Sequence, residues 1–356
     1  MLPMKAFALK SPGDAGYINV PAPELTPHGA LLKPIAISLC TTDIHTIYTG
    51  SPKAPNLILG HECVAEILSV GQHVNDFKPG DIVAVPAITP DWTAPSIQDG
   101  NHNHANAPFS GHQLGRTLPG VFAEMFAIPH ASSTLAKVPE GVSIEQALLS
   151  VDVITTGFTG AECADIKFGD TVCVLGIGPI GLMAIVGAKL RGAGEIIAVG
   201  NRKISIEVAK IFGATHIFSY KNEDIEKNIL ALTNGIGVDS TIIAGGNDDT
   251  FIQAFNITRY GIGTISNISY VGGTGNIPIP KFSSGRGMAG KTVRMELAKG
   301  GRARIERILN MIKLNRFDPS PLITHRLHGF DKIGQALNMM REKSDDMLKI
   351  AIYTQF

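Results

Sequence analysis

The chain has 356 residues, of which 44% are hydrophobic and 17% charged, and its 31 basic side chains balance its 31 acidic ones. This length favours two domains of comparable size. The even charge gives no sign of a polyanion-binding surface, so we expect no nucleic-acid partner. The first residues, MLPMKAFALKSPGD, lack the pattern of a secretory signal. We therefore expect a cytoplasmic location.

Two other classes of protein are disfavoured. The stretch from Thr171 to Ala188 is long and uncharged, but its glycines and Pro179 predict a strand, a turn and a buried helix rather than a membrane span. No membrane partner is expected. The four cysteines form no CxxC pair, which argues against a disulfide scaffold and a four-thiolate zinc site. Any metal must have mixed ligands.

In chain order, residues up to 151 predict a β-rich domain, because short apolar runs alternate with Pro, Gly and Asn or Asp. The runs are KAFAL, ALLKPIAI, HECVAEILSV, DIVAVPA and VFAEMFAI. Between residues 90 and 120 the chain is polar and without periodicity. This segment predicts an excursion over the surface.

After residue 151, apolar runs without alternation are separated by helix-length segments, which is typical of a parallel sheet covered by helices. The runs are TVCVLGIG, EIIAVG, HIFSY, STIIAGG and TISNISY. The chain ends in two helical segments and a strand, LKIAIYT, which we expect to rejoin the first domain. The predicted domains are 1–152 with 297–356, β-rich and catalytic, and 153–296, which binds a dinucleotide.

A glycine-rich turn predicts where the nucleotide binds. The segment TVCVLGIGPIGLMA fits G-x-G-x-x-G directly after a strand and before a helix, as in a Rossmann doubly wound sheet. The alternative is a glycine-rich turn in a nucleotide-free domain. The predicted contacts are Gly176, Ile177, Gly178, Pro179, Ile180 and Gly181.

The next strand indicates which dinucleotide is bound. An NAD site would carry an acidic residue there, whereas this chain has Gly200, Asn201 and Arg202. Arg202 can hold a 2′-phosphate through charge-assisted hydrogen bonds, and Tyr220 can cover the adenine or donate to the phosphate. These residues favour NADP. The alternative is that Arg202 is a solvent-exposed residue at a helix start with no role in binding.

Three side chains are candidate ligands of a catalytic zinc ion, which needs about three protein ligands and an open position. Cys40 and His61 each lie where an apolar run meets a polar turn, and Asp152 lies at the predicted domain junction. By spacing alone the set is only suggestive. Cys40 is alternatively a packed core residue, and Asp152 alternatively caps the helix TTGFTGAE.

Together these segments resemble the zinc-containing medium-chain alcohol dehydrogenases, especially the NADP-dependent secondary-alcohol dehydrogenases of anaerobic microbes. The resemblance implies an α/β fold with a GroES-like catalytic domain, one zinc ion and NADP(H) per chain, and a homotetramer. It implies Cys40, His61 and Asp152 as ligands and Glu62 as an exchangeable fourth. The matching segments are CTTDIHT, GHE, DFKPGD, VPAITPDW, DVITTGFTGAE, VLGIGPIGLMA, GAKLRGAG, IIAVGNR and IIAGGN.

The resemblance also implies further site residues. Thr42 would accept the alcohol proton and pass it through the cofactor ribose to His45. As alternatives, Thr42 is a turn residue and His45 an exposed helix residue. The implied additional cofactor contacts are Ile268, Ser269, Tyr270 and Lys343, and the implied walls of the substrate pocket are Ala87, Ile88, His112 and Leu297.

Three departures from the family pattern bear on these expectations. Ala65 stands where the GHE signature usually has a further glycine, and His112 stands where close relatives carry a pocket tryptophan. The four-cysteine structural-zinc loop is absent, because residues 90–120 contain no cysteine. We therefore expect one zinc ion per chain, and the substrate size preference of the family does not carry over to this chain.

Two rival functions remain open at the level of sequence. One is a zinc-free NADPH-dependent reductase of enones or quinones with the same fold, which would not need the three candidate ligands together. The other is a nucleotide-binding protein without catalytic activity. Metal content and an assay with propan-2-ol distinguish them from an alcohol dehydrogenase.

Overall fold

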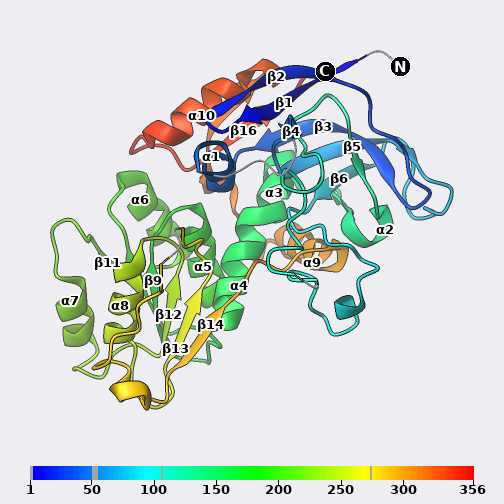
Figure 1. Ribbon diagram of the computed structural model, residues 1–356. Helices are drawn as coiled ribbons and strands as arrows, with labels where there is room; N and C mark the ends of the chain where they lie inside the picture. The colour runs from blue at the N-terminus through cyan, green and yellow to red at the C-terminus, as the bar shows by residue number, and fades with distance from the viewer. Residues whose placement is uncertain (1–2, 50–54, 106, 273–274) are drawn as a thin grey trace. The chain divides into compact units, whose positions relative to one another are not determined.

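The computed structural model describes residues 3–49, 55–105, 107–272 and 275–356, and the chain forms two compact units (Figure 1). Unit 1 comprises Met1–Thr155 with Lys299–Phe356, and unit 2 comprises Thr156–Ala298. The first unit is thus built from two separate stretches of chain, whereas the second is continuous.

Unit 2 is a parallel sheet of six strands in the order β11-β10-β9-β12-β13-β14, with every neighbouring pair parallel. This is the strand order of a doubly wound dinucleotide-binding domain, so the predicted fold class of this unit is confirmed. The strands are β9 (Thr171–Leu175), β10 (Glu195–Val199), β11 (His216–Phe218), β12 (Ser240–Ile243), β13 (Thr264–Asn267) and β14 (Thr292–Met295).

Helices precede β9 and follow β9, β10, β11 and β12, because amphipathic or apolar segments flank these buried runs. They are α4 (Thr155–Cys163), α5 (Pro179–Leu190), α6 (Lys203–Phe212), α7 (Ile225–Leu232) and α8 (Asp248–Ile257). The stretch 171–188 is divided into β9, a glycine turn and α5, as expected. Within the described residues, no helix has the length and apolar character needed to cross a membrane. The core between sheet and helices includes Phe251, Phe255 and Ile229.

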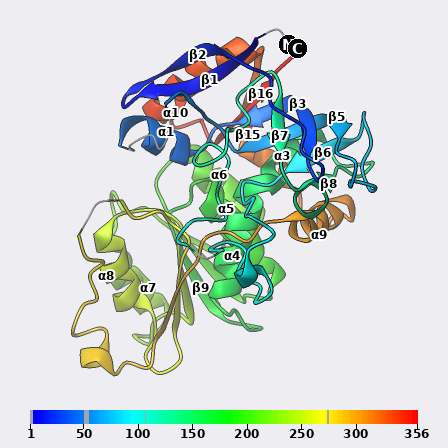
Figure 2. The same ribbon diagram turned by 45° about the vertical axis from the view of Figure 1, so that its right-hand side comes forward.

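Unit 1 is mainly β structure (Figure 2). Its larger sheet has the order β15-β16-β3-β5-β6-β8, with β7 also paired to β3, and its smaller sheet has the order β2-β1-β4. The strands are β1 (Met4–Ser11), β2 (Asp14–Val20), β3 (Ala30–Ser38), β4 (Leu57–Ile58), β5 (Glu62–Val70), β6 (Ile82–Val85), β7 (Phe126–Ile128), β8 (Ala136–Lys137), β15 (Ile323–His328) and β16 (Lys349–Tyr353).

Short helices and turns complete unit 1. The α-helices are α1 (Thr41–Tyr48), α2 (Ala131–Thr134), α3 (Ile144–Leu149), α9 (Arg302–Lys313) and α10 (Ile333–Glu342), and the 3-10 turns are η1 (Pro95–Ile97), η4 (Ser320–Leu322) and η5 (Phe330–Lys332). A further 3-10 turn, η3 (Gly285–Gly287), lies in unit 2. Only Phe126–Ile128 of the expected strand VFAEMFAI is a strand. Val121 and Phe122 before it are buried and bond to the backbone at Gly60 and Leu59 instead.

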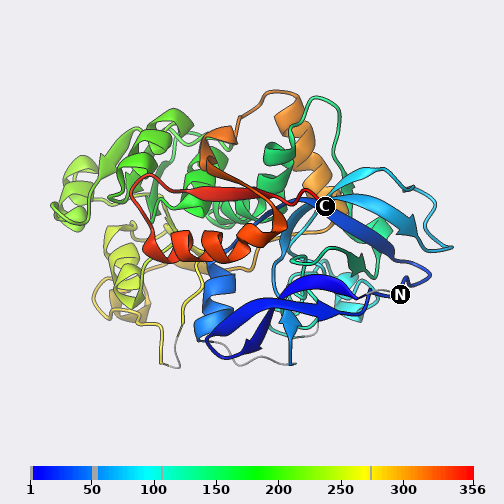
Figure 3. The same ribbon diagram turned by 90° about the horizontal axis from the view of Figure 1, so that it is seen from above.

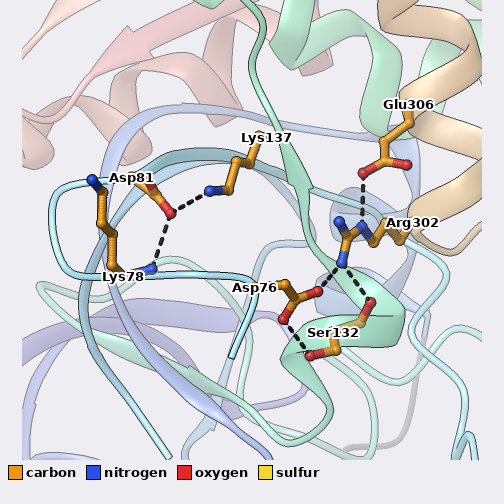
Figure 4. A network of polar contacts seen from close by, with 7 residues as sticks. All are labelled: Asp76, Lys78, Asp81, Ser132, Lys137, Arg302 and Glu306. Atoms are coloured by element: carbon orange, nitrogen blue, oxygen red, sulfur yellow. Dashed lines mark hydrogen bonds and ion pairs between the residues drawn. The ribbon is translucent and has the colours of Figure 1, made fainter. Parts of the chain in front are cut away.

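The C-terminal segment of unit 1 packs into the sheet made by the N-terminal segment. Strand β16, drawn red in Figure 3, pairs antiparallel with β3, and β15 pairs parallel with β16. Ion pairs also join the two segments, and Arg302 of α9 bridges Asp76 and Glu306 (Figure 4). The terminal strand therefore rejoins the first unit, as its apolar run predicted.

Candidate active site

Four side chains in unit 1 converge on one point. Cys40, His61, Glu62 and Asp152 each offer a ligand atom, and these atoms all lie within 4.8 Å of one another. Ligand atoms about 2.0 to 2.3 Å from one zinc ion in a tetrahedral site lie roughly 3.3 to 3.8 Å from each other. Side-chain shifts of about 1 Å would therefore bring all four atoms onto a single ion. We call these four residues the metal group.

Cys40 lies at the junction between β3 and α1. Its backbone N–H donates to Asp43 Oδ2 at 2.9 Å, which caps the start of the helix and fixes the thiol. Burial and the neighbouring Asp152 raise the pKa of Cys40, and His61 opposes the rise. The thiolate form that binds metal therefore needs a cation beside it.

His61 directly precedes β5 and is only 3% exposed. Its Nδ1 lies 3.8 Å from Asp43 Oδ1, and its Nε2 lies 3.7 Å from Asp152 Oδ2. Although burial lowers the pKa of His61, Asp43, Asp152 and Cys40 together raise it well above its usual value. The arrangement matches a ligand histidine whose second nitrogen faces a carboxylate, which orients the ring.

Glu62 is fully buried beside a buried lysine. Lys349 Nζ donates to Glu62 Oε1 at 2.6 Å and to the Leu39 carbonyl at 2.8 Å. Burial raises the pKa of Glu62 to about 7, against the effect of Lys349. Glu62 Oε2 makes no hydrogen bond, so one carboxylate oxygen is anchored while the other is left for another partner.

These features fit a zinc ion. The donor set of one thiol, one imidazole and two carboxylates consists of groups that zinc binds. The acidic members share a buried space in which their negative charges repel, and Glu62 Oε2 is a buried acceptor without a partner. A divalent cation would offset the repulsion between the negative charges and give Glu62 Oε2 a partner.

Asp152 does not cap a helix, so that alternative is wrong. It lies inside a π-helical segment, Ser150–Ile154, between α3 and α4. The wider π turn re-aims side chains relative to a regular helix. The backbone N–H of Ala87 donates to the Val151 carbonyl at 3.0 Å, which ties this segment to the end of β6.

The other predicted residues of unit 1 lie around this group to differing extents. Thr42 Oγ1 is 3.5 Å from Cys40 Sγ, and His45 is exposed one turn further along α1. Ala87 and Ile88 are each 3% exposed. The ring of His112 lies 4.6 Å from that of His61, and burial, together with His61, lowers the pKa of His112 well below its usual value.

In unit 2 the glycine turn has the conformation that a dinucleotide site requires. Gly176 has φ +89° and follows β9, and Gly178 precedes α5, with Pro179 as its first residue. A Cβ at Gly181 would lie 1.9 Å from the Gly176 carbonyl, whereas a Cβ at Gly178 would meet nothing within 4 Å. Gly181 therefore serves packing, and Gly178 leaves space at the helix N-terminus for a phosphate.

At the end of β10, Gly200 is packed as well as uncharged. A Cβ there would lie 2.2 Å from Ile177 Cγ1, so the turn and the strand end touch. Arg202 is the N-cap residue directly before α6, and Tyr220, just beyond β11, is 59% exposed.

The remaining predicted contacts do not all belong to one unit. Ile268 is buried after β13, Ser269 N–H donates to Asn267 Oδ1, and Tyr270 is exposed. Leu297 belongs to unit 2 and Lys343 to unit 1.

Two residues of the site were missed by sequence reasoning. Asp43, 3% exposed, faces both Cys40 and His61, and Lys349 holds Glu62. The signal for Asp43 is its place three residues after Cys40, where a helix cap is expected. The signal for Lys349 is a charged residue inside the apolar terminal run, because buried lysines are rare without a partner.

The fold and the four-residue group define a metal-dependent dehydrogenase of two units. The chain belongs to the zinc-binding alcohol dehydrogenase family, as predicted. Residues 26–140 match the model of the alcohol dehydrogenase GroES-like domain, and residues 179–313 match that of the zinc-binding dehydrogenases.

Several known proteins are similar over the full chain. The NADP-dependent isopropanol dehydrogenase of Thermoanaerobacter brockii is 47% identical over 97% of this chain and 98% of its own, and that of Entamoeba histolytica is 44% identical over 97% and 94%. Among solved structures, the alcohol dehydrogenase of Thermus sp. ATN1 is 27% identical, with a TM-score of 0.86, and covers 99% of this chain and 100% of that one.

Proposed function

We propose that this protein is an NADP-dependent zinc alcohol dehydrogenase that interconverts small secondary alcohols and ketones, and also aldehydes, by hydride transfer. The convergence of Cys40, His61, Glu62 and Asp152 carries the proposal, because a zinc-free reductase of the same fold has no need of such a group. The names of the two isopropanol dehydrogenases support the substrate class and the cofactor.

Cys40, His61 and Asp152 would hold the zinc ion, with Glu62 as an exchangeable fourth ligand. When bound, the ion supplies a Lewis acid that lowers the pKa of an alcohol hydroxyl. Asp43 keeps the His61 ring oriented, and Lys349 holds one oxygen of Glu62. The thiolate and the Asp152 carboxylate together balance a 2+ charge, so the loaded group is electrically neutral before Glu62 joins it.

Thr42 and His45 would move the proton. Thr42 Oγ1 lies beside Cys40 Sγ, so its hydroxyl is placed to accept a proton from a molecule bound at the metal group. His45 is three residues further on the same helix and exposed. An exposed imidazole at that place would carry the proton onward from Thr42.

NADP would bind unit 2 with its pyrophosphate at the N-terminus of α5. Gly178 leaves space for it, and Arg202, at the start of α6, would pair with the 2′-phosphate. Gly200 carries no charge that would repel this phosphate. Ile268, Ser269, Tyr270, Tyr220 and Lys343 remain proposed contacts of the cofactor.

A single assay tests the proposal. Purified protein is measured for zinc content and then for oxidation of propan-2-ol with NADP and with NAD. We expect about one zinc ion per chain, turnover that depends on it, and a preference for NADP. Reduction of an enone or quinone with NADPH by zinc-free protein would instead support the rival reductase, and nucleotide binding without turnover would support the non-catalytic alternative.

We further propose a homotetramer and a cytoplasmic location. Strand β14 is the edge of its sheet, and exposed apolar side chains gather on it and on the segments before it, as at surfaces that pair with another chain. They include Ile262, Phe282, Met288, Val293 and Met295. Light scattering after size exclusion tests the tetramer. The four free cysteines support a reducing compartment.

A further inference from the structure

A polar atom beside the metal group has no partner and no part in the proposed reaction. The ring of His112 meets that of His61 edge to face, with 4.6 Å between centroids and 75° between planes. Its Nε2 is buried and makes no hydrogen bond. A buried polar atom left without a partner is unfavourable, so such an atom next to a reaction centre is placed to pair with a bound molecule.

A second atom of the same kind lies on the neighbouring segment. Thr89 is 4% exposed, and its Oγ1 also makes no hydrogen bond. The backbone N–H of Thr89 donates to the Gly111 carbonyl at 2.6 Å, so the residue before His112 is bonded to Thr89. Thr89 follows Ala87 and Ile88, the apolar walls proposed for the substrate. Two unpaired polar atoms therefore lie on two adjoining segments beside the metal group.

We propose that His112 and Thr89 form a subsite for a second oxygen of the substrate, so that the enzyme prefers α-hydroxy ketones and vicinal diols to plain ketones and alcohols of the same size. This inference rests on the proposed function and deepens it. A hydroxyl both donates and accepts, as a threonine hydroxyl does, and a ring nitrogen supplies the complementary partner. A methyl group in its place leaves both protein atoms unpaired.

The test compares two ketones that differ only in this group. Hydroxyacetone and butan-2-one have the same number of non-hydrogen atoms, with a hydroxyl in one where the other has a methyl. The kcat/KM of each is measured with NADPH for the wild type and for His112→Phe, which keeps a ring but removes the nitrogen. The hydroxyl also makes the carbonyl of hydroxyacetone more reactive in itself. The test is therefore how the ratio of the two kcat/KM values differs between the wild type and the variant.

We expect the ratio of hydroxyacetone to butan-2-one to fall by about tenfold or more in His112→Phe, since one hydrogen bond in a buried site is lost. Because His112 is also a proposed wall of the substrate pocket, both kcat/KM values are expected to change in this variant, and only their ratio tests the subsite. Gln places an amide near the position of Nε2, so His112→Gln should retain most of the preference. Thr89→Val, which has nearly the same shape as the native side chain, should lower the ratio in the same direction.

Three results would overturn the inference. An unchanged ratio in His112→Phe, with butan-2-one still reduced, leaves the proposed function standing and removes the subsite. Loss of zinc or of both activities in that variant shows that His112 supports the metal group instead. A wild-type protein that neither reduces these ketones nor oxidises propan-2-ol removes the proposed function, and the inference with it.

Discussion

At the scale of single residues, the site is a set of charges that stabilise one another only as a group. Glu62 is fully buried and Lys349 is 6% exposed, and they form an ion pair at 2.6 Å. Breaking a buried pair from one side costs about 3 to 5 kcal/mol, because the other charge is left without a partner. The metal group therefore depends on residues that bind no metal themselves.

The four-residue group predicts how zinc is lost. Asp152→Ala or Cys40→Ala should lower zinc affinity by more than about 100-fold, since the loss of an outer-sphere partner alone costs 10- to 100-fold. Dinucleotide binding by unit 2 should be nearly unchanged. Zinc analysis and NADP titration measure the two effects. Cys63→Ala is the control, because Cys63 is buried in the core and lies outside the metal group; equal zinc loss in this control would refute the assignment.

Lys349 yields a prediction about stability. Lys349→Met should lower the free energy of unfolding of the zinc-free protein by about 3 to 5 kcal/mol, because Glu62 is left buried and unpaired. The double variant with Glu62→Gln should regain much of this loss, since the uncompensated charge is gone. Denaturant unfolding of all four proteins with a chelator present provides the measurement. Additive effects of the two substitutions would mean that the residues do not interact.

At the scale of elements, the glycine turn separates packing from binding. Gly181→Ala would place a Cβ 1.9 Å from the Gly176 carbonyl and should destabilise unit 2, whereas the Cβ of Gly178→Ala meets open space. We expect Gly178→Ala to keep the melting temperature and weaken NADP binding, because the added methyl occupies the approach of the pyrophosphate. Thermal melts and NADP titrations of both variants test this. A melting temperature that falls equally in both would contradict the division of roles.

The residues between the end of β10 and the start of α6 should determine which dinucleotide the protein prefers. Arg202→Ala should weaken NADP by about 1.5 to 3 kcal/mol and NAD far less. Gly200→Asp should abolish NADP binding, because the carboxylate repels the 2′-phosphate. It should not create a good NAD site, because the new Cβ would lie 2.2 Å from Ile177 Cγ1. Adding Ile177→Ala should then improve NAD binding. Titration with each dinucleotide decides, and equal weakening of both by Arg202→Ala would defeat the assignment.

Periodicity predicted the elements that bury a face and missed those that do not. The parallel strands of unit 2 are apolar runs bounded by glycines, and they were predicted from that pattern. Strand β14 was not predicted because all four of its residues are exposed, so it has no apolar pattern. The π turn that carries Asp152 was not predicted because its side chains are mostly buried, as they are in a regular buried helix. The contact of Gly200 with Ile177 and the pairing of Lys349 with Glu62 depend on long-range packing. The local sequence shows only that a lysine lies within an apolar run.

At the scale of the whole molecule, unit 1 must join two stretches of chain before Lys349 can hold Glu62 of the metal group. Lys349 comes from the C-terminal stretch, and Arg302 of the same stretch joins Asp76, the Ser132 carbonyl and Glu306 (Figure 4). Arg326 makes a two-bond pair with Glu145 at 2.6 and 2.7 Å. At neutral pH these contacts hold the two stretches of unit 1 together, which we call the closure of unit 1.

This closure should weaken in acid. Burial raises the pKa of Asp76, but Ser132 and Arg302 outweigh it and leave the pKa below its usual value. A depressed carboxyl pKa contributes stability above the unfolded value of about 3.9, and this contribution is lost as the pH falls through the folded pKa. Arg302→Met should therefore lower the melting temperature of unit 1 at pH 7, by about 2 to 4 °C for each kcal/mol lost.

The difference between wild type and Arg302→Met should shrink as the pH is lowered below about 4, where the unfolded carboxyl is protonated. Calorimetric melts across this range measure it. Lys167→Met is the matched control, because Lys167 pairs with Asp165 in unit 2, where both side chains are well exposed. Such pairs contribute about 0 to 1 kcal/mol, so this variant should melt nearly as the wild type does. The guanidinium carbon of Arg302 lies 5.0 Å from the centroid of the Phe77 ring. A difference for Arg302→Met that stays constant with pH would show that this packing, rather than the charge of Arg302, holds the two stretches of unit 1 together.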